Sequence, residues 1–207
     1  MESTEEPGKA VDHRLIRAQY TDETITVYQA YSPHIAEPAV AAGTFVAPFK
    51  RDRMTWIKPS FRWMMYRSGW ATKPGQERVL AIRISRTGFE WALRHACLSH
   101  FERGVHDTQS AWQESKLTSP VRVQWDPERA TDLSDLRHRA IQIGLSGEAV
   151  DLYVNEWIIE LRDITPLVRA IHDDVRAGRW ERADAAIPAE ERYPIPADIR
   201  TRLGASG

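Results

Sequence analysis

Cysteine is almost absent from this chain, and the absence limits the classes of protein to which the chain can belong. The 207 residues include a single cysteine, Cys97, so no internal disulfide can form. A lone thiol is typical of a reducing compartment. The sequence also lacks the run of roughly 18 apolar residues that a membrane-spanning helix needs. We therefore expect a cytoplasmic protein that has no membrane partner.

The short motifs that mark common cofactor and metal sites are missing as well. The chain has no GxxxxGKS/T phosphate loop, no GxGxxG turn, no CxxC pair, no HExxH and no GxSxG. The spacings of His95, His100 and His106 do not place these histidines on one face of a helix. We therefore expect no metal site. Cys97 lies in an apolar pattern, which predicts a small core residue and not a nucleophile.

The sequence has no large excess of one charge. Its formal net charge is −1, so the molecule as a whole is not a basic nucleic-acid binder, and any attraction to phosphate must come from a local patch. Tryptophan, by contrast, is abundant. There are eight, and Trp56, Trp63 and Trp70 follow one another at intervals of seven residues. For any single tryptophan, a place in the core is the stronger interpretation.

Length and composition predict one main domain. An apolar content of 42% and a charged content of 28% are ordinary for a globular protein. Residues 1–13 are predicted to be a disordered tail, residues 14–178 a single α+β domain of catalytic type, and residues 179–207 a C-terminal extension with a Pro-rich, peripheral end.

Hydrophobic periodicity predicts the secondary structure. Strands are expected over residues 24–31, 53–57, 79–84, 121–125, 140–145 and 157–161. Helices are expected over residues 38–42, 61–66, 89–101, 132–138 and 166–177, with Ser60 and Thr165 as caps. Residues 44–47 are expected to be extended, residues 72–76 to form a turn and residues 104–118 to form a loop.

Basic and aromatic side chains are densest between Pro48 and Arg67. The basic residues of this segment are Lys50, Arg51, Arg53, Lys58, Arg62 and Arg67. Guanidinium groups bind phosphate oxygens in a bidentate manner, and aromatic rings stack on bases. The composition therefore predicts a site for a nucleotide or a nucleic-acid strand. A buried aromatic core bordered by solvated Arg and Lys side chains explains it about equally well.

Two glutamines interrupt apolar or aromatic strand patterns. Gln29, beside Tyr28 and Tyr31, can hydrogen-bond a carboxamide or a ribose hydroxyl, although a water-facing residue on an edge strand is the more common case. Gln142 is the single polar side chain in residues 140–145, so it must find a partner or face a cleft.

The run MTWIKPSF (residues 54–61), followed by WMMYRSGW (residues 63–70), closely resembles the domain-of-unknown-function 4291 family. YQAY (residues 28–31) and IQIGL (residues 141–145) are similar to the same family. The resemblance extends from Ile16 to Val168. The family name by itself implies no activity.

The order of strand, turn, short helix, glycine and extended aromatic strand resembles, more weakly, the opening of ADP-ribosyltransferase folds. This resemblance implies an α+β core of two small, mostly antiparallel sheets around a cleft, with peripheral helices. It also implies NAD as the substrate. Gln29 then stands where His or Arg is usual, and Gln142 where the catalytic Glu is usual. The implied NAD-binding residues are Tyr28, Gln29, Tyr31, Thr55, Trp56, Lys58 and Ser60.

Cleavage of the bond between nicotinamide and ribose builds positive charge on the ribose carbon, and a carboxylate normally stabilises that charge. Gln142 can hold the ribose hydroxyl or orient an acceptor base, but a neutral amide cannot offset the charge. Three alternatives remain open. Glu148 or Glu156 supplies the charge, the acceptor is a strong nucleophile, or the protein binds without catalysing.

The resemblance to ADP-ribosyltransferases, together with the basic and aromatic segment, thus implies an NAD-dependent ADP-ribosyltransferase. A nucleic-acid base, in RNA or DNA, is the expected acceptor, because Arg51, Arg53 and Arg67 suit a phosphate-bearing partner. One alternative is a non-catalytic module that binds RNA or another single strand. The others are a protein-directed ADP-ribosyltransferase and an interaction protein whose Trp-rich segment is simply core.

Overall fold

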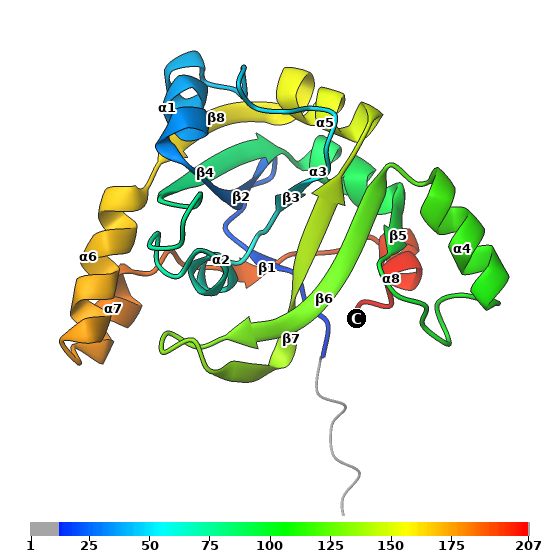
Figure 1. Ribbon diagram of the computed structural model, residues 1–207. Coiled ribbons are helices and arrows are strands. Elements are labelled where there is room, and N and C mark those ends of the chain that lie inside the picture. Colours follow the sequence, from blue (N-terminus) through cyan, green and yellow to red (C-terminus); the bar gives the residue numbers. More distant parts are fainter. Residues whose placement is uncertain (1–12, 207) are drawn as a thin grey trace, which may run out of the picture.

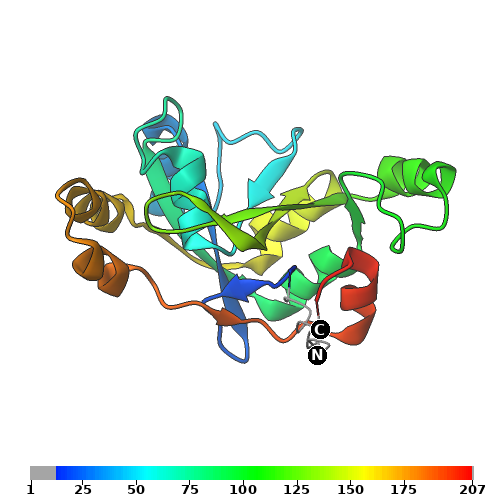
Figure 2. The same cartoon turned by 90° about the horizontal axis from the view of Figure 1, so that it is seen from below.

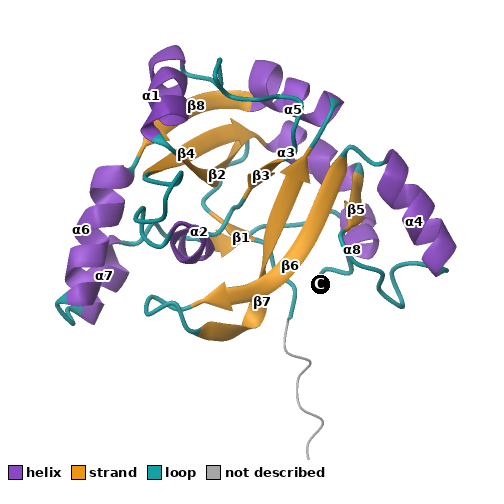
Figure 3. Cartoon of the chain, in the orientation of Figure 1, coloured by secondary structure: helices purple, strands orange, loops and turns teal. Residues whose placement is uncertain are grey.

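Two small sheets dominate the α+β fold that the computed structural model describes for residues 13–206 (Figures 1 and 3). The first sheet has the order β2 (Thr24–Tyr31), β4 (Arg78–Ser85) and β8 (Ile158–Asp163), with both pairs antiparallel. The second has the order β3 (Thr55–Ile57), β7 (Asp135–Leu145), β6 (Val121–Arg129) and β5 (Ala96–Leu98). Within this sheet the β5–β6 pair is parallel, and the other two pairs are antiparallel. The predicted α+β class with small, mostly antiparallel sheets is therefore confirmed.

The two sheets meet where β2 approaches the end of β3. Tyr28 and Lys58 exchange two backbone hydrogen bonds there, with N···O distances of 2.7 and 3.2 Å. The strand β2 was predicted with its observed bounds, because β-branched and aromatic residues alternate along it. Successive residues of a strand point to opposite faces, so Val27 enters one apolar cluster and Tyr28 the other.

The larger apolar cluster fills the space between the sheets. Helix α3 (Arg86–Arg94) contacts strands of both sheets, and its Phe89 is fully buried in this cluster. The smaller cluster covers the other face of the first sheet. Met64 of α2 (Phe61–Ser68) and Val168 of α6 (Thr165–Arg176) contribute to it. Ser60 caps α2, as predicted, by accepting a hydrogen bond from Trp63 N at 3.1 Å.

Several local predictions were wrong where a distant partner decides the structure. The predicted helix over residues 89–101 ends at Arg94, because residues 96–98 pair with β6. The predicted helix over residues 132–138 is replaced by the start of β7, which pairs with an extended β6. The strand predicted over residues 121–125 continues through Pro127 to Arg129 as β6. The ladder continues through this proline with an irregular register, which accommodates a residue that cannot donate a hydrogen bond.

Helical content was also underestimated. The predicted loop over residues 104–118 contains α4 (Gln109–Thr118), which has no buried residue and therefore no apolar stripe to reveal it. Helix α1 (Pro33–Ala42) begins five residues earlier than the position expected from Pro38, with Pro33 in its first turn. Residues 44–47 form no strand. Thr165 is the first residue of α6 and not its cap; its Oγ1 accepts a hydrogen bond from Val79 N.

The end of the C-terminal segment was expected to be peripheral, but it packs against the core. Figure 2 shows it running, orange to red, from α7 (Trp180–Ala186) across the molecule to α8 (Ala197–Leu203). On the way β9 (Glu191–Arg192) pairs with β1 (Arg17–Ala18). Tyr193, Ile199 and Leu203 belong to the larger apolar cluster. Of the predicted disordered tail, residues 1–12 lie outside the described residues. Among the described residues, no helix is long and apolar enough to cross a membrane.

Candidate functional site

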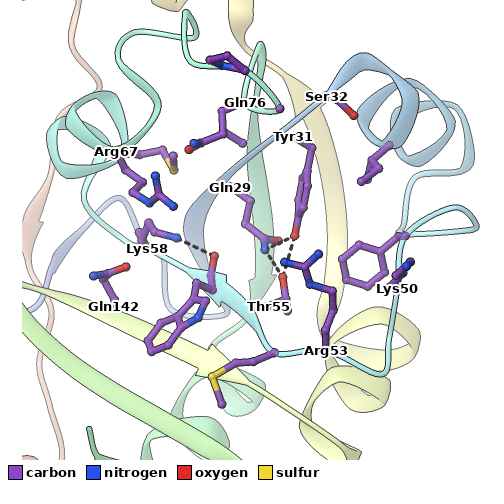
Figure 4. Close-up of a pocket in the computed structure, with 18 of the residues that line it drawn as sticks. Gln29, Tyr31, Ser32, Lys50, Arg53, Thr55, Lys58, Arg67, Gln76 and Gln142 are labelled. Atoms are coloured by element: carbon purple, nitrogen blue, oxygen red, sulfur yellow. Dashed lines mark hydrogen bonds between the residues drawn. The ribbon is translucent and has the colours of Figure 1, made fainter. Parts of the chain in front are cut away.

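A pocket with a volume of about 590 Å³ lies where the two sheets meet (Figure 4). Its wall comes from β2, β3, β7, α1 and α2 together with residues 48–50, 53–54 and 74–76. Of the site residues predicted from the sequence, it collects Gln29, Tyr31, Arg53, Thr55, Trp56, Lys58, Arg67 and Gln142. These residues come from three separate regions of the sequence, and the pairing of β2, β3 and β7 brings the regions together.

One side of the pocket is a hydrogen-bonded group of Gln29, Tyr31 and Thr55. Gln29 Nε2 donates to Thr55 Oγ1 at 2.7 Å and to the Tyr31 hydroxyl at 2.9 Å. Gln29 Oε1 accepts from the Tyr153 hydroxyl at 2.8 Å. Gln29 is 2% exposed, and both its amide hydrogens are used within the protein. In this structure Gln29 therefore acts by holding the two hydroxyls that it contacts.

That arrangement leaves one donor for a ligand. The hydroxyl oxygens of Tyr31 and Thr55 are 2.7 Å apart, so one hydroxyl donates to the other. Each also accepts from Gln29 Nε2. Two hydroxyls carry two hydrogens, and only one lies between them, so the second is available to an acceptor such as a phosphate or ribose oxygen. Burial raises the pKa of Tyr31 to about 12, so the hydroxyl of Tyr31 stays protonated at neutral pH.

The charge of the pocket is one-sided. Four of its lining residues are basic (Lys50, Arg53, Lys58 and Arg67), and none of the lining residues that the structure describes is acidic. Figure 4 shows Lys50 and Arg53 on one side of the Gln29 group, and Lys58 and Arg67 on the other. A concave wall with one sign of charge concentrates ligands of the opposite sign. The pocket is therefore suited to an anionic ligand that has charge at more than one point.

Lys58 is an unusual member of this set because it is only 6% exposed. Its Nζ donates to Trp56 O at 2.9 Å and lies 5.7 Å from the centre of the Trp63 ring. Burial, followed by repulsion from Arg67, lowers the pKa of Lys58 to about 7, while Asp126 acts in the opposite sense. A bound anion would favour the charged form of Lys58.

Gln142 lies on β7, opposite Gln124 of β6. Its Nε2 donates to Asp126 Oδ2, and Gln124 Nε2 donates to Asp126 Oδ1 at 2.9 Å. No described residue donates to the Gln142 carbonyl oxygen. Figure 4 shows this oxygen on the side of the amide that faces Lys58. The buried polar residue predicted in this strand thus has a partner, Asp126, and also reaches the pocket.

The indole of Trp56 packs over Gly144 of the neighbouring strand. A Cβ atom at residue 144 would lie 3.0 Å from Trp56 Cε2 and 2.7 Å from Met54 Sδ. Residue 144 must therefore lack a side chain for both groups to keep these positions. Trp56 is half-buried and lines the pocket, so part of its ring is available for stacking.

Four predicted site residues do not line this pocket. The ring of Tyr28 faces the smaller apolar cluster, 5.5 Å from Phe61. Ser60 donates to Glu128 Oε1 at 2.9 Å in a second pocket of about 510 Å³. Arg51 binds Asp151 and Asn155. Glu148, one of the two glutamates expected to supply negative charge, is exposed in α5 (Glu148–Leu152).

Sequence reasoning missed two contributors. Tyr153 begins the π-helical segment Tyr153–Trp157, and no local pattern indicated that its hydroxyl reaches Gln29. Asp126 lies directly after the strand that was predicted over residues 121–125. The alternation of Gln124 and Asp126 on one face of β6 was the available signal, but it required the strand to continue through Pro127. Within residues 13–206, no cluster of His, Cys, Asp and Glu side chains is arranged to hold a metal ion.

Comparison with known proteins is informative at the level of the family. A search of the curated proteins finds no match. The family model described as "Domain of unknown function (DUF4291)" matches residues 15–193. The match includes the three strands that form the pocket and extends to Tyr193, so α8 lies beyond it. The chain therefore belongs to the DUF4291 family.

Proposed function

We propose that the pocket binds NAD and that the protein is an ADP-ribosyltransferase that modifies a nucleic-acid base. One observation carries the proposal. Thr55, Gln142 and the group around Gln29 converge, with four basic side chains, on one pocket that has no acidic lining residue among those described. A dinucleotide requires this combination of cations for its two phosphates and hydrogen-bonding groups for its riboses.

The strand arrangement supports the proposal. The resemblance to ADP-ribosyltransferases assigned functional residues to the strands of Gln29, Thr55 and Gln142. Those strands lie side by side: β2 bridges to the end of β3, and β3 pairs with β7. A cleft between two small sheets, lined by all three strands, is the arrangement that the resemblance implied.

Charge and size are also consistent with NAD. The diphosphate carries two negative charges, which the lysine and arginine side chains of the pocket neutralise. The volume of about 590 Å³ is within the usual range of about 300–1,000 Å³ for small-molecule sites. The spare hydroxyl hydrogen of Tyr31 or Thr55 adds a neutral donor for a phosphate or ribose oxygen.

In the proposed reaction the C1′–N bond of NAD breaks, and nicotinamide leaves with the bonding electron pair. A nitrogen or oxygen of the acceptor base forms the new bond to C1′, and its proton is released to solvent. Gln142 holds a ribose hydroxyl through its carbonyl oxygen. Trp56, half-buried at the pocket, offers a ring on which the nicotinamide or the acceptor base can stack.

Calorimetric titration with NAD, without nucleic acid, tests the binding step. Replacing Arg67 by alanine is expected to weaken NAD binding about tenfold or more, since a hydrogen bond to a charged group contributes about 1.5–3 kcal/mol. Arg62→Ala is the matched control. Arg62 lies on the same helix but pairs with Asp184 outside the pocket, so its loss should leave NAD affinity unchanged.

Incubation with NAD labelled in the adenylate phosphate, together with RNA, DNA or protein, tests the transfer step. Label is expected on the nucleic acid, and a parallel reaction should release one nicotinamide for each transfer. Label on protein alone would identify a protein-directed transferase. Absence of both NAD binding and label on every acceptor would refute the proposed activity.

A module that binds single-stranded nucleic acid without catalysis is the second candidate, supported by the half-buried Trp56 beside the four basic residues. It predicts binding of RNA in the absence of NAD, with an affinity that falls steeply as salt rises. Trp56→Ala should weaken that binding while leaving the fold intact.

A further inference from the structure

We propose that Asp126 is a positioning residue that fixes the side-chain amide of Gln142, so that the pocket selects a ligand group that donates a hydrogen bond. In NAD that group is a hydroxyl of the ribose next to nicotinamide. This inference rests on the proposed function. It adds a specificity determinant that is not itself part of the pocket wall, because Asp126 does not line the pocket.

The geometry places one carboxylate between two amides. Gln124 and Gln142 are directly opposite in the β6–β7 ladder, and Asp126 is two residues further along β6, on the same face as Gln124. Asp126 Oδ1 accepts from Gln124 Nε2 at 2.9 Å, and Asp126 Oδ2 accepts from Gln142 Nε2. Each carboxylate oxygen is therefore assigned to a different amide.

The chemistry of the carboxylate determines how the Gln142 amide is turned. An ionised carboxylate is only an acceptor, so the NH₂ group of the amide must face it. The reverse orientation would bring the carbonyl oxygen against the carboxylate oxygen and leave both without a hydrogen. With its NH₂ directed to Asp126, Gln142 presents its carbonyl oxygen to the side that faces Lys58 in Figure 4.

A carbonyl oxygen in this position discriminates between ligands. It accepts a hydrogen bond from a hydroxyl of the ligand. It forms no hydrogen bond with a ligand group that lacks a donor, such as a C–H group or an oxygen without a hydrogen. Gln142 is 9% exposed, so an unmatched ligand group would leave a nearly buried carbonyl without a partner. The bond to Asp126 also strengthens the carbonyl as an acceptor, because hydrogen bonds in a chain polarise one another.

Asp126 also supplies a negative charge, which the sequence analysis expected from Glu148 or Glu156. Both glutamates are exposed and neither lines the pocket, whereas Asp126 accepts a hydrogen bond from Gln142. The charge of Asp126 reaches Lys58, whose pKa it raises against the larger effects of burial and Arg67. The amide and the carboxylate together thus do part of what a single carboxylate does at an oxocarbenium-like centre.

The test compares NAD with analogues in which fluorine replaces the 2′ or the 3′ hydroxyl of the nicotinamide ribose, because fluorine cannot donate a hydrogen bond. We expect the wild-type protein to bind NAD about tenfold more tightly than at least one of these analogues, measured by calorimetry. In the Asp126→Asn variant, the new amide can donate to the Gln142 carbonyl, so Gln142 can turn its NH₂ to the pocket. An NH₂ group can donate to fluorine as well as to a hydroxyl oxygen. The affinity ratio between NAD and the analogue should then fall towards one.

The affinity ratio separates a positioning role of Asp126 from a structural one. A general disruption of the pocket would weaken the binding of NAD and of the analogue by the same factor, so the ratio would not change. Asp135→Asn is the matched control: Asp135 is an exposed carboxylate of the same hairpin that pairs with Arg129, and its replacement should leave the ratio unchanged. An unchanged ratio in the Asp126→Asn variant would overturn the inference. Equal binding of NAD and both analogues by the wild type would overturn it too, while leaving NAD binding intact. No binding of NAD at all would instead refute the proposed function.

Discussion

The hydroxyl of Tyr153 donates a 2.8 Å hydrogen bond to Oε1 of Gln29, across 124 positions of the sequence. Both side chains are buried, at 0% and 2% exposure, so neither can exchange this bond for one to water. The bond fixes the amide of Gln29, which then directs its two hydrogens to Tyr31 and Thr55. The positions of Gln29, Tyr31 and Thr55 in the pocket wall therefore depend on Tyr153, which does not line the pocket.

Replacing Tyr153 by phenylalanine should destabilise the protein by about 1–3 kcal/mol, because Gln29 Oε1 loses its partner while it remains buried. Urea unfolding measures the change. Tyr66→Phe is the control, since Tyr66 is 38% exposed and no described residue hydrogen-bonds its hydroxyl; its effect should stay within about 0.5 kcal/mol. Equal effects of the two substitutions would contradict the importance of the Tyr153–Gln29 bond.

Replacing Gly144 by alanine should displace Trp56 and Met54, because the new Cβ would lie 3.0 Å from the indole and 2.7 Å from the sulfur. We expect the variant to fold, since Met54 is flexible, but to bind its ligand at least several-fold more weakly as the Trp56 platform shifts. Tryptophan fluorescence reports the change around the indole, and calorimetry reports affinity. Gly43→Ala is a useful comparison. No atom lies within 4 Å of a Cβ at residue 43. The left-handed backbone there makes alanine unfavourable, so this variant should lose stability but keep its affinity for the ligand.

Lys58 should make the stability depend on pH in the alkaline range. Its pKa is about 7 in the folded protein and near 10.5 when unfolded, so between these values the unfolded chain binds more protons. A rise in pH then favours the folded state. The free energy of unfolding of the wild type, relative to that of Lys58→Met, should increase by up to about 1.4 kcal/mol per pH unit from pH 7 to 10. Denaturant unfolding at a series of pH values measures the difference. A constant difference would show that Lys58 is charged in the fold.

Glu190 should have the opposite effect at lower pH. Burial raises the pKa of this carboxyl from 4.5 to about 8, partly offset by the hydrogen bond that Phe61 N donates to it. Between pH 4.5 and 8 the folded protein holds a proton that the unfolded chain has lost, so a rise in pH destabilises the fold. Glu190→Gln keeps the acceptor for Phe61 N and removes the titration.

The Glu190→Gln variant should therefore become progressively more stable than the wild type as the pH rises through this range, by up to about 1.4 kcal/mol per pH unit. Thermal unfolding at pH 5 and pH 8.5 compares the two proteins. Glu191→Gln, at an exposed position of β9, should show no such trend. If the difference in stability between the wild type and Glu190→Gln does not increase with pH, Glu190 ionises normally in the folded protein.

The sequence by itself determined the elements whose signals are local. The alternation of residues 24–31 specified β2, and the Ser60 cap with the following apolar residues specified α2, because strand period, capping and helical spacing depend on neighbouring positions. The basic and aromatic segment was recognised by composition. Arg53, Thr55, Trp56, Lys58 and Arg67 do line the pocket.

Only the tertiary structure decided the elements and contacts that need a distant partner. Residues 96–98 and the first residues of β7 are strands because β6 offers them free hydrogen-bonding groups, against a local preference for helix. The same holds for the pocket. Tyr153 reaches Gln29, and Asp126 orients Gln142, only after β2, β3, β7 and the π-helical segment have packed together. A one-dimensional pattern records which side chains are polar, but the orientation of an amide depends on the partner that the fold places beside it.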